Sequence, residues 1–194
     1  MAQGMVSFDH GVQGTLIRGI LPELENNVVD LGRQMKLGRL DNLRPGEFGI
    51  VLGIDLARSL GASMGSKITV IAPQGQVTPA GILPRLKQFT VVGVFEAGMS
   101  VYDAGLALVH MDDAAKLYRM EDKVSGVRLK IKDLYLAPRV SRELAASLPG
   151  DYFVRDWTQQ NANFFRAVQM EKTVMFVIMF FIVAVAAFNI VSTL

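Results

Sequence analysis

Apolar residues are spread unevenly along the 194 residues of this chain, and the most apolar stretch lies at its C-terminal end. The run TVMFVIMFFIVAVAAFNIVSTL, residues 173–194, contains no charged side chain. A helix rises about 1.5 Å per residue, so a run of this length can cross a hydrocarbon layer of about 30 Å. We therefore predict a transmembrane helix. A buried helix in a large soluble core is the alternative, although such segments seldom stay uncharged for more than about 18 residues.

Residues 1–172 consist of short β-branched or alternating segments separated by glycine and proline. Strands are predicted where Val, Ile, Thr and Phe are enriched, at residues 5–21, 67–72, 89–95, 107–111, 124–131 and 151–157. Helices are predicted at residues 23–29, 54–60 and 136–148, with a further one starting at 112 or 113. Strands outnumber helices and the two alternate irregularly, which favours an α+β fold over a doubly wound parallel sheet.

No proline or glycine occurs between Thr158 and Leu194. This predicts one continuous helix of about 37 residues, roughly 55 Å long, whose first part projects out of the bilayer. A stiff helix of this kind can transmit motion between a folded domain and the membrane. A passive stalk fits the periodicity equally well.

The charge balance and the absence of cysteine exclude several classes of protein. Twenty Lys and Arg residues are interleaved with 18 Asp and Glu residues without a run of like charge, so we expect no nucleic-acid partner. Without cysteine there can be no disulfide, iron–sulfur cluster or thiolate zinc site. The first ten residues, MAQGMVSFDH, do not have the pattern of a signal peptide. We therefore expect that a membrane anchor upstream exports the domain and that more chain follows residue 194.

Motifs that carry catalysis are missing from the sequence. In GASMGSKIT, residues 61–69, three residues separate the glycines and the serine precedes Lys67, whereas a Walker A loop needs four residues between them and a hydroxyl residue after the lysine. The two histidines, His10 and His110, have no second ligand at helical spacing. No G-x-S-x-G nucleophile motif occurs. We expect neither a catalytic site nor a metal or other cofactor.

The segment PQGQVTPAGILP, residues 73–84, is the most unusual part of the polar region. It has three prolines, two glycines and no charge, and it lies between two predicted strands. We interpret it as a stiff loop, because proline fixes φ and removes a hydrogen-bond donor. Exposed apolar side chains such as Ile82 and Leu83 would mark an interaction site there. The alternative is that the loop folds back and buries these two residues on its own domain.

The membrane run contains only three polar residues after Thr173, namely Asn189, Ser192 and Thr193. An asparagine in lipid is costly unless it hydrogen-bonds to a neighbouring helix. Asn189 and Ser192 therefore predict that this helix packs against partner helices.

Several motifs together resemble the LolC/LolE membrane subunits of the bacterial lipoprotein-releasing ABC transporter. They are LIRGILP (residues 16–22), TPAGILPR (78–85), DYFVRDW (151–157), FFRAVQMEK (164–172) and VAAFNIVSTL (185–194). The resemblance covers essentially the whole chain. TPAGILPR and AVQMEK resemble LolC, or a LolC-like fused form, more than LolE.

This resemblance implies a MacB-like periplasmic domain of two subdomains in residues 1–172, followed by the second transmembrane helix of the subunit, residues 173–194, in the bacterial inner membrane. The subunit would not be an enzyme, since a separate LolD-type ATPase hydrolyses ATP. Its membrane partner would be a LolE-type or an identical subunit. The complex would extract lipoproteins from the inner membrane and pass them to the periplasmic chaperone LolA.

The resemblance also implies a β-hairpin arm at residues 73–89, the hook that binds LolA. The residues that match the hook are Thr78, Pro79, Ala80, Gly81, Ile82, Leu83 and Pro84 at the tip, with Arg85 and Lys87 on the return. A supporting surface, the pad, lies near the hook in the family, but no short motif marks its position in this chain.

Two other classes of protein remain as alternatives. A MacB-like efflux subunit or an FtsX-like regulator would share the fold but not the TPAGILPR arm. A membrane-tethered enzyme would require a pocket with convergent titratable side chains, for example near His110.

Overall fold

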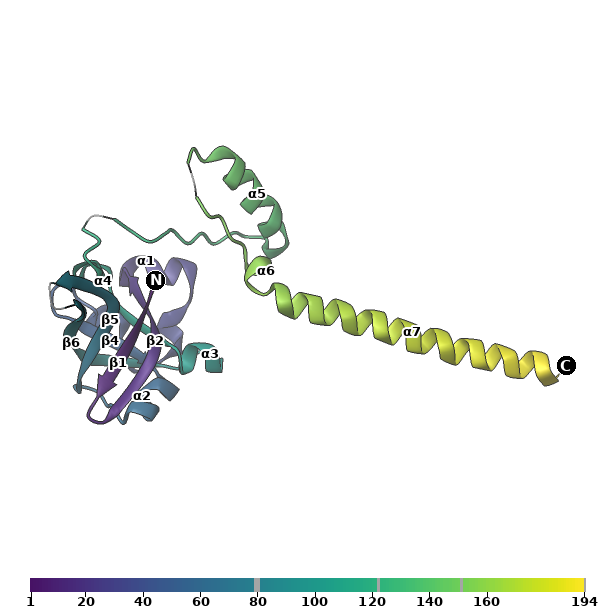
Figure 1. Cartoon of the computed structure of the whole chain (residues 1–194), viewed down its shortest axis with the longest axis horizontal. Helices are drawn as coiled ribbons and strands as arrows, with labels where there is room; N and C mark the ends of the chain where they lie inside the picture. The colour runs from purple at the N-terminus through teal and green to yellow at the C-terminus, as the bar shows by residue number, and fades with distance from the viewer. Residues whose placement is uncertain (79–80, 122, 151, 194) are drawn as a thin grey trace. The chain divides into compact units, whose positions relative to one another are not determined.

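A computed structural model describes residues 1–78, 81–121, 123–150 and 152–193. The chain divides into two compact units, Met1–Lys130 (unit 1) and Ile131–Leu194 (unit 2) (Figure 1). Each unit is described by itself below. Together they contain helices and strands in irregular alternation, which confirms the predicted α+β class.

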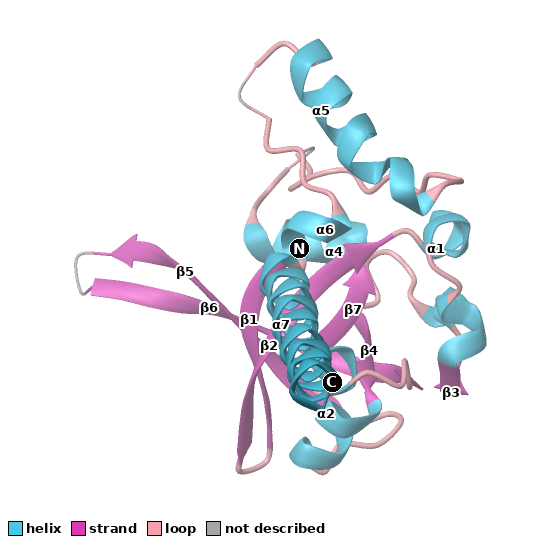
Figure 2. Ribbon diagram, turned by 90° about the vertical axis from the view of Figure 1, so that its right-hand side faces the viewer, coloured by secondary structure: helices cyan, strands magenta, loops and turns pink. Residues whose placement is uncertain are grey.

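Unit 1 is built on a mixed sheet (Figure 2). Its strands are β1 (Ala2–Phe8), β2 (Gly11–Ile20), β3 (Met35–Gly38), β4 (Gly49–Gly53), β5 (Lys67–Thr78), β6 (Gly81–Phe95) and β7 (Leu106–His110). The order is β3-β6-β4-β7-β2-β1-β5, and β5 also pairs with β6. The sheet therefore closes on itself through β6, and β3 lies beside β6 outside this closed ring.

Short helices cover the sheet and complete two apolar clusters. The helices of unit 1 are α1 (Pro22–Val28), α2 (Ile54–Leu60), α3 (Ser100–Asp103) and α4 (Met111–Tyr118), with 3-10 turns η1 (Leu31–Gln34) and η2 (Leu40–Asn42). Leu56 and Leu60 of α2 and Leu117 of α4 pack on one face of the sheet. Leu31 and Leu40 of the turns belong to a cluster with Leu108 of β7.

The loop before β4 is fixed by a buried carboxylate on α4. Asp113 is completely buried and accepts hydrogen bonds from the backbone N–H groups of Gly46 at 2.8 Å and Phe48 at 3.0 Å. Lys116 lies 4.0 Å from the same carboxylate. Two N–H groups and one ammonium group therefore compensate its charge, and the loop that carries Phe48 is held in place.

Unit 2 consists of η3 (Leu134–Leu136), α5 (Ala137–Ser147), α6 (Trp157–Gln160) and α7 (Ala162–Thr193). Helix α7 has 32 residues, so it is about 48 Å long. By length and composition it can cross a membrane, and its side chains are almost all exposed. The sequence-based prediction of a long apolar C-terminal helix is therefore confirmed.

Three sequence-based predictions about local structure are wrong. The helix expected to run unbroken from Thr158 is divided at Asn161, whose side-chain amide donates to the carbonyl of Trp157 at 2.8 Å. Asparagine competes for backbone groups in this way and favours the end of a helix. Residues 73–84, interpreted as a loop, belong largely to β5 and β6.

The third wrong prediction concerns two strands. Residues 124–131 and 152–156 are not part of any described sheet, although their composition is typical of strands. A strand needs a neighbour for its backbone hydrogen bonds, and no described strand lies beside either segment. Residue 151 of the predicted second strand lies outside the described residues.

Candidate partner-binding arm

The hairpin formed by β5 and β6 is the candidate functional site. The two strands pair antiparallel from Lys67↔Thr90 to Ala72↔Arg85, and again from Gln76↔Leu83 to Thr78↔Gly81. Pro79 and Ala80, which connect them in the sequence, lie outside the described residues. The range 73–89, in which the sequence predicts an arm, lies within this hairpin.

The base of the hairpin is anchored in the core of unit 1. Ile68, Val70 and Ala72 alternate along β5 and are completely buried, and Phe89 on β6 is buried with them. Strand β1 pairs with β5 only as far as residue 71, through Met5↔Ile71. Beyond this point the only described partner of β5 is β6, so the outer part is a two-stranded ribbon that leaves the sheet (Figure 2). An isolated ribbon is only marginally stable, so the arm depends on its buried base.

The ladder is interrupted where two prolines lie opposite each other. The register shifts between Ala72 and Gln76, so that Pro73, Gln74 and Gly75 face the single residue Pro84 on β6. Neither proline has an N–H group to donate. An interruption of the β5–β6 pairing at Pro73 and Pro84 therefore costs fewer hydrogen bonds than one elsewhere in the hairpin. Bulges of this kind bend a strand and increase its twist. The register shift therefore separates the buried base of the arm from its outer part.

Lys87 lies at the base of the arm over an aromatic pair. Its ammonium nitrogen is 4.0 Å from the centroid of the Phe48 ring. The Phe48 and Phe89 rings meet edge to face, with centroids 5.5 Å apart. A second cation, Lys116, lies 5.8 Å from the Phe48 centroid. The basic residue predicted at the return of the arm is thus held by an aromatic ring, which favours a cation electrostatically.

Arg85 is the second basic residue at the return. It pairs with Ala72 across the hairpin and is half-buried. Its Nε atom is buried and has no hydrogen-bond partner among the described residues.

An apolar row crosses the sheet at the base of the arm, on the face opposite the core. Met5 of β1 pairs with Ile71 of β5, which pairs with Leu86 of β6, so the three side chains are direct neighbours on one face. Met5 is exposed, Ile71 is half-buried and Leu86 is 62% exposed. Adjoining exposed apolar residues on a sheet surface can mark an interaction site. Sequence reasoning missed this row because it depends on the pairing of β1 with β5, residues far apart in the chain.

The described residues among the predicted site residues lie on three elements, β5, β6 and α7. Thr78, Gly81, Ile82 and Leu83 lie in the outer strands of the arm, Pro84, Arg85 and Lys87 lie on the return strand, and Asn189 and Ser192 lie on α7. Asn189 and Ser192 are three residues apart and exposed, so they occupy the same face of α7.

In unit 2, Asp156 joins the segment before α7 to α5. Its carboxylate accepts hydrogen bonds from the hydroxyl of Ser141 at 3.0 Å and from the N–H groups of Thr158 at 2.8 Å and Gln159 at 3.1 Å. The Thr158 hydroxyl donates to the same carboxylate. These bonds, led by that from the Thr158 hydroxyl, lower the pKa of Asp156, while burial opposes them. Asp156 thus caps α6 and fixes α5 to it.

The aromatic residues at this junction also hold it together. The indole N–H of Trp157 donates to the carbonyl of Leu134 at 3.1 Å. The Trp157 ring meets the Phe165 ring of α7 edge to face, with centroids 5.4 Å apart. Helix α7 is therefore joined to η3 and α6 through one tryptophan.

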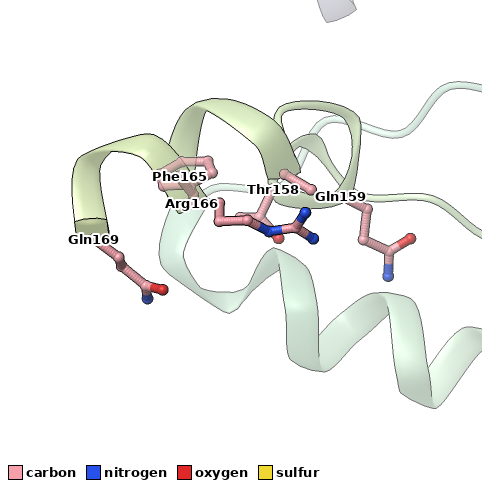
Figure 3. Close-up of a pocket in the computed structure, with 6 residues that line it drawn as sticks. Thr158, Gln159, Phe165, Arg166 and Gln169 are labelled. Atoms are coloured by element: carbon pink, nitrogen blue, oxygen red, sulfur yellow. The ribbon is translucent and has the colours of Figure 1, made fainter. Parts of the chain in front are cut away.

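A shallow hollow of about 350 Å³ lies at the same junction (Figure 3). It is lined by Thr158, Gln159, Ala162, Phe165, Arg166 and Gln169. Arg166 is its one charged residue, so the hollow has no acid–base pair. His110, which the enzyme alternative would use, is buried at the start of α4, where its Nδ1 accepts the N–H of Asp112 at 3.3 Å. The described residues contain no group of three side chains that could hold a metal ion.

Comparison with known proteins shows the family to which the chain belongs. The model of the MacB-like periplasmic core domain matches residues 2–147. The chain belongs to this family.

Within this family, the chain is similar to LolC proteins from several bacteria. The chain is 50% identical over 184 residues to the lipoprotein-releasing system transmembrane protein LolC of Neisseria meningitidis serogroup B, an alignment that covers 94% of this chain and 44% of the relative. It is 47% identical to LolC of Xylella fastidiosa, over 93% of this chain and 44% of the relative. It is 33% identical to LolC of Haemophilus influenzae, over 95% of this chain and 45% of the relative. The resemblance to LolC/LolE subunits is thus confirmed, and the chain spans less than half the length of these relatives.

Proposed function

We propose that these residues are part of the membrane subunit of an ABC transporter that extracts lipoproteins from the inner membrane and passes them to the chaperone LolA. The observation that carries the proposal is the similarity to LolC proteins, which extends over 94% of the chain. Residues 1–172 would lie in the periplasm and 173–194 in the bacterial inner membrane. ATP hydrolysis would occur on a separate LolD-type subunit.

The arm of β5 and β6 is the hook that recruits LolA. Its outer part extends beyond β1 and is joined to the rest of unit 1 by a buried base, which suits an element that enters a partner. Its sequence between residues 76 and 84 has no charge and contains Val77, Ile82 and Leu83. Apolar residues of this kind suit the lipid-binding opening of a lipoprotein chaperone.

The apolar row Met5–Ile71–Leu86 is the pad that supports the docked chaperone. It lies at the base of the arm and is accessible at Leu86. A partner that encloses the outer part of the arm would also contact this apolar row at its base. Two separated contacts, tip and base, would fix the orientation of the chaperone.

Helix α7 couples the periplasmic units to the membrane part of the transporter. Asn189 and Ser192 share one face, which would contact a helix of a LolE-type or identical subunit. The break at Asn161 and the bonds of Asp156 and Trp157 make the junction with α5 and η3 a defined joint instead of a uniform rod.

Binding of LolA tests the proposal. We expect Ile82→Asp and Leu83→Asp to weaken the capture of LolA by at least about tenfold, because burying one Ile or Leu side chain contributes about 1.5–3 kcal/mol and each 1.4 kcal/mol corresponds to a factor of ten. Val101→Asp is the matched control, since Val101 of α3 is 80% exposed and does not belong to the arm. Full binding by both arm variants would contradict the assignment of the hook.

The same experiment separates the remaining candidate. A MacB-like efflux subunit or an FtsX-like regulator would share the family fold, which the match to the MacB-like domain leaves open. Such a protein would not capture LolA at all. Capture by the unaltered chain and its loss in the arm variants would favour the lipoprotein transporter.

A further inference from the structure

The shallow hollow beside the break at Asn161 has no part in the recruitment of LolA. It is lined by residues of α6 and of the first two turns of α7, and in Figure 3 Gln159, Arg166 and Gln169 lie on one side of the ribbon. Its volume of about 350 Å³ lies at the lower end of the range of about 300–1,000 Å³ that is usual for small-ligand sites. The hollow is therefore large enough to hold a small polar group.

The hollow lies close to the level at which α7 would leave the lipid. The uncharged run of α7 begins at Thr173. At about 1.5 Å per residue, Gln169 lies about 6 Å and Arg166 about 10 Å before this run. The headgroup layer adds about 5–7 Å on each side of the hydrocarbon core, and the long side chain of an arginine can extend several ångströms along a helix to reach it. Lipid phosphates of the adjoining leaflet are therefore within reach of the hollow.

The chemistry of the lining fits a phosphate ester. Arg166 supplies the one positive charge, and a guanidinium group binds phosphate oxygens through paired N–H groups. Gln159 and Gln169 supply side-chain amides that can donate to ester or hydroxyl oxygens. Phe165 and Ala162 give the hollow an apolar part, which fits the glycerol backbone and the first acyl carbons of a phospholipid.

The charges around the hollow favour one kind of headgroup. Among the described residues, the lining contains no carboxylate. Asp156, which precedes the lining residues, is buried and accepts hydrogen bonds from Ser141, Thr158 and Gln159, so its charge is compensated within unit 2. An ethanolamine or choline group would therefore find no anion in the lining, whereas a glycerol headgroup adds only hydroxyl groups. An anionic lipid such as phosphatidylglycerol fits the hollow better than a zwitterionic one.

We propose that the hollow between α6 and the start of α7 binds the phosphate of an anionic phospholipid from the adjoining leaflet, and that Arg166 recognises it. A lipid held there would contact both helices and would brace the break at Asn161. This binding requires only that α7 crosses a membrane. It does not depend on LolA or on the transport of lipoproteins.

Fluorescence of Trp157, the single tryptophan of the chain, tests this binding. The Trp157 ring packs against Phe165 of the lining, with centroids 5.4 Å apart. The 194-residue chain is held in micelles of an uncharged detergent and titrated with phosphatidylglycerol or phosphatidylcholine. We expect a saturable change with phosphatidylglycerol, half-complete at a mole fraction at least about fivefold lower than with phosphatidylcholine, because one basic residue near an anionic lipid contributes about this factor. Equal half-saturation by the two lipids, or no saturable change, would overturn the proposal.

Three variants separate a site from a general attraction to anionic lipid. Arg166→Gln should raise the half-saturating mole fraction of phosphatidylglycerol at least about fivefold. Lys172→Gln is the matched control, because it removes the same charge from α7, nearer to the membrane but outside the lining, and it should leave the mole fraction nearly unchanged. Ala162→Leu keeps every charge but fills the hollow, and it should weaken binding as well.

The variants also have outcomes that would contradict the site. All three positions are exposed on α7, so the fold should tolerate the substitutions. If Lys172→Gln weakened binding as much as Arg166→Gln, surface charge alone would attract the lipid. If Ala162→Leu bound phosphatidylglycerol like the unaltered chain, the lipid would not occupy the hollow. Either result would overturn the proposal.

Two further probes identify the group that is recognised. Diacylglycerol has acyl chains but no phosphate, and it should cause no saturable change. Inorganic phosphate has no acyl chains, and it should not compete with phosphatidylglycerol at equal concentration. Binding of diacylglycerol as tight as that of phosphatidylglycerol would assign the hollow to acyl chains, and full competition by inorganic phosphate would assign it to the free ion. Either result would replace a phospholipid as the ligand and overturn the proposal.

Discussion

Replacement of Phe89 by alanine tests how the arm is anchored. Phe89 is only 1% exposed and its ring packs edge to face against Phe48 at 5.5 Å. Removing a buried phenylalanine typically costs about 3–5 kcal/mol, which includes the cavity that remains. The aromatic pair accounts for about 0.5–1.5 kcal/mol of this. Unit 1 should therefore lose about 3–5 kcal/mol of its free energy of unfolding.

The assay is hydrogen exchange of the amides of β4 and β7, which lie in the middle of the strand order. The slowest amides of a domain report its global stability. A loss of about 3–5 kcal/mol corresponds to exchange that is about 140- to 3700-fold faster, since each 1.4 kcal/mol is a factor of ten. The matched control is Leu86→Ala on the same strand, where the side chain is 62% exposed, so stability should change by no more than about 0.5 kcal/mol.

Two outcomes would refute this reasoning. If Phe89→Ala cost less than about 1 kcal/mol, the base of the arm would not be part of the core. If Leu86→Ala were as destabilising as Phe89→Ala, the assignment of the two faces of β6 would be wrong.

Three further predictions concern the surroundings of the arm and the junction before α7. Asp113→Asn should destabilise unit 1 by about 1.5–3 kcal/mol, because an asparagine amide would have to turn its NH₂ group toward one of the two backbone N–H donors. Hydrogen exchange of the β7 amides measures this loss, and an unchanged exchange rate would contradict it. Gly53→Ala should also destabilise unit 1, because a Cβ there would lie 2.3 Å from the carbonyl oxygen of Asp103. In Gly61→Ala the new Cβ would meet no atom within 4 Å, but alanine would be strained by the backbone φ of +69°. Thermal unfolding of both glycine variants would show whether contact or backbone strain costs more. Asp156 should make the stability of unit 2 depend on pH. Its folded pKa is lowered from the ordinary value of 3.8, so its contribution is complete above that value and is lost as pH falls through the folded pKa. Trp157 fluorescence against pH checks this, and Asp156→Asn should remove the acid-dependent step.

Local composition was sufficient to predict several elements of the fold. The β-branched runs at residues 67–72 and 89–95 lie in β5 and β6, and Gly61 ends α2 in a left-handed conformation as a glycine there suggests. The apolar run after residue 173 forms the greater part of α7. In each case the signal lies within a few neighbouring residues.

Features that depend on distant partners could not be predicted. The closed ring of strands requires β5 to pair with β1 and β6 at once, and the apolar row Met5–Ile71–Leu86 exists only through that pairing. The burial of Asp113 was equally hidden, because its partners Gly46 and Phe48 lie more than 60 residues away. Near Asn161, one polar side chain overrode a helical pattern that lacks glycine and proline.

The segment of residues 124–130 shows a different limit. Its alternation is a property of the sequence, but pairing requires a neighbour, and the described residues do not provide one. Pattern and structure therefore disagree at residues 124–130, because a strand pattern does not by itself supply the neighbour that backbone hydrogen bonds need.

Photo-cross-linking from the arm tests directly whether the hairpin of β5 and β6 recruits LolA. A photoreactive amino acid is placed at position 82 of the full-length subunit in its complex, and at position 101 on α3 as the control, and each protein is illuminated with LolA. We expect a covalent adduct with LolA from position 82 and none from position 101. Adducts from both positions at equal yield, or from position 101 alone, would contradict the role of the arm as the site that recruits the chaperone.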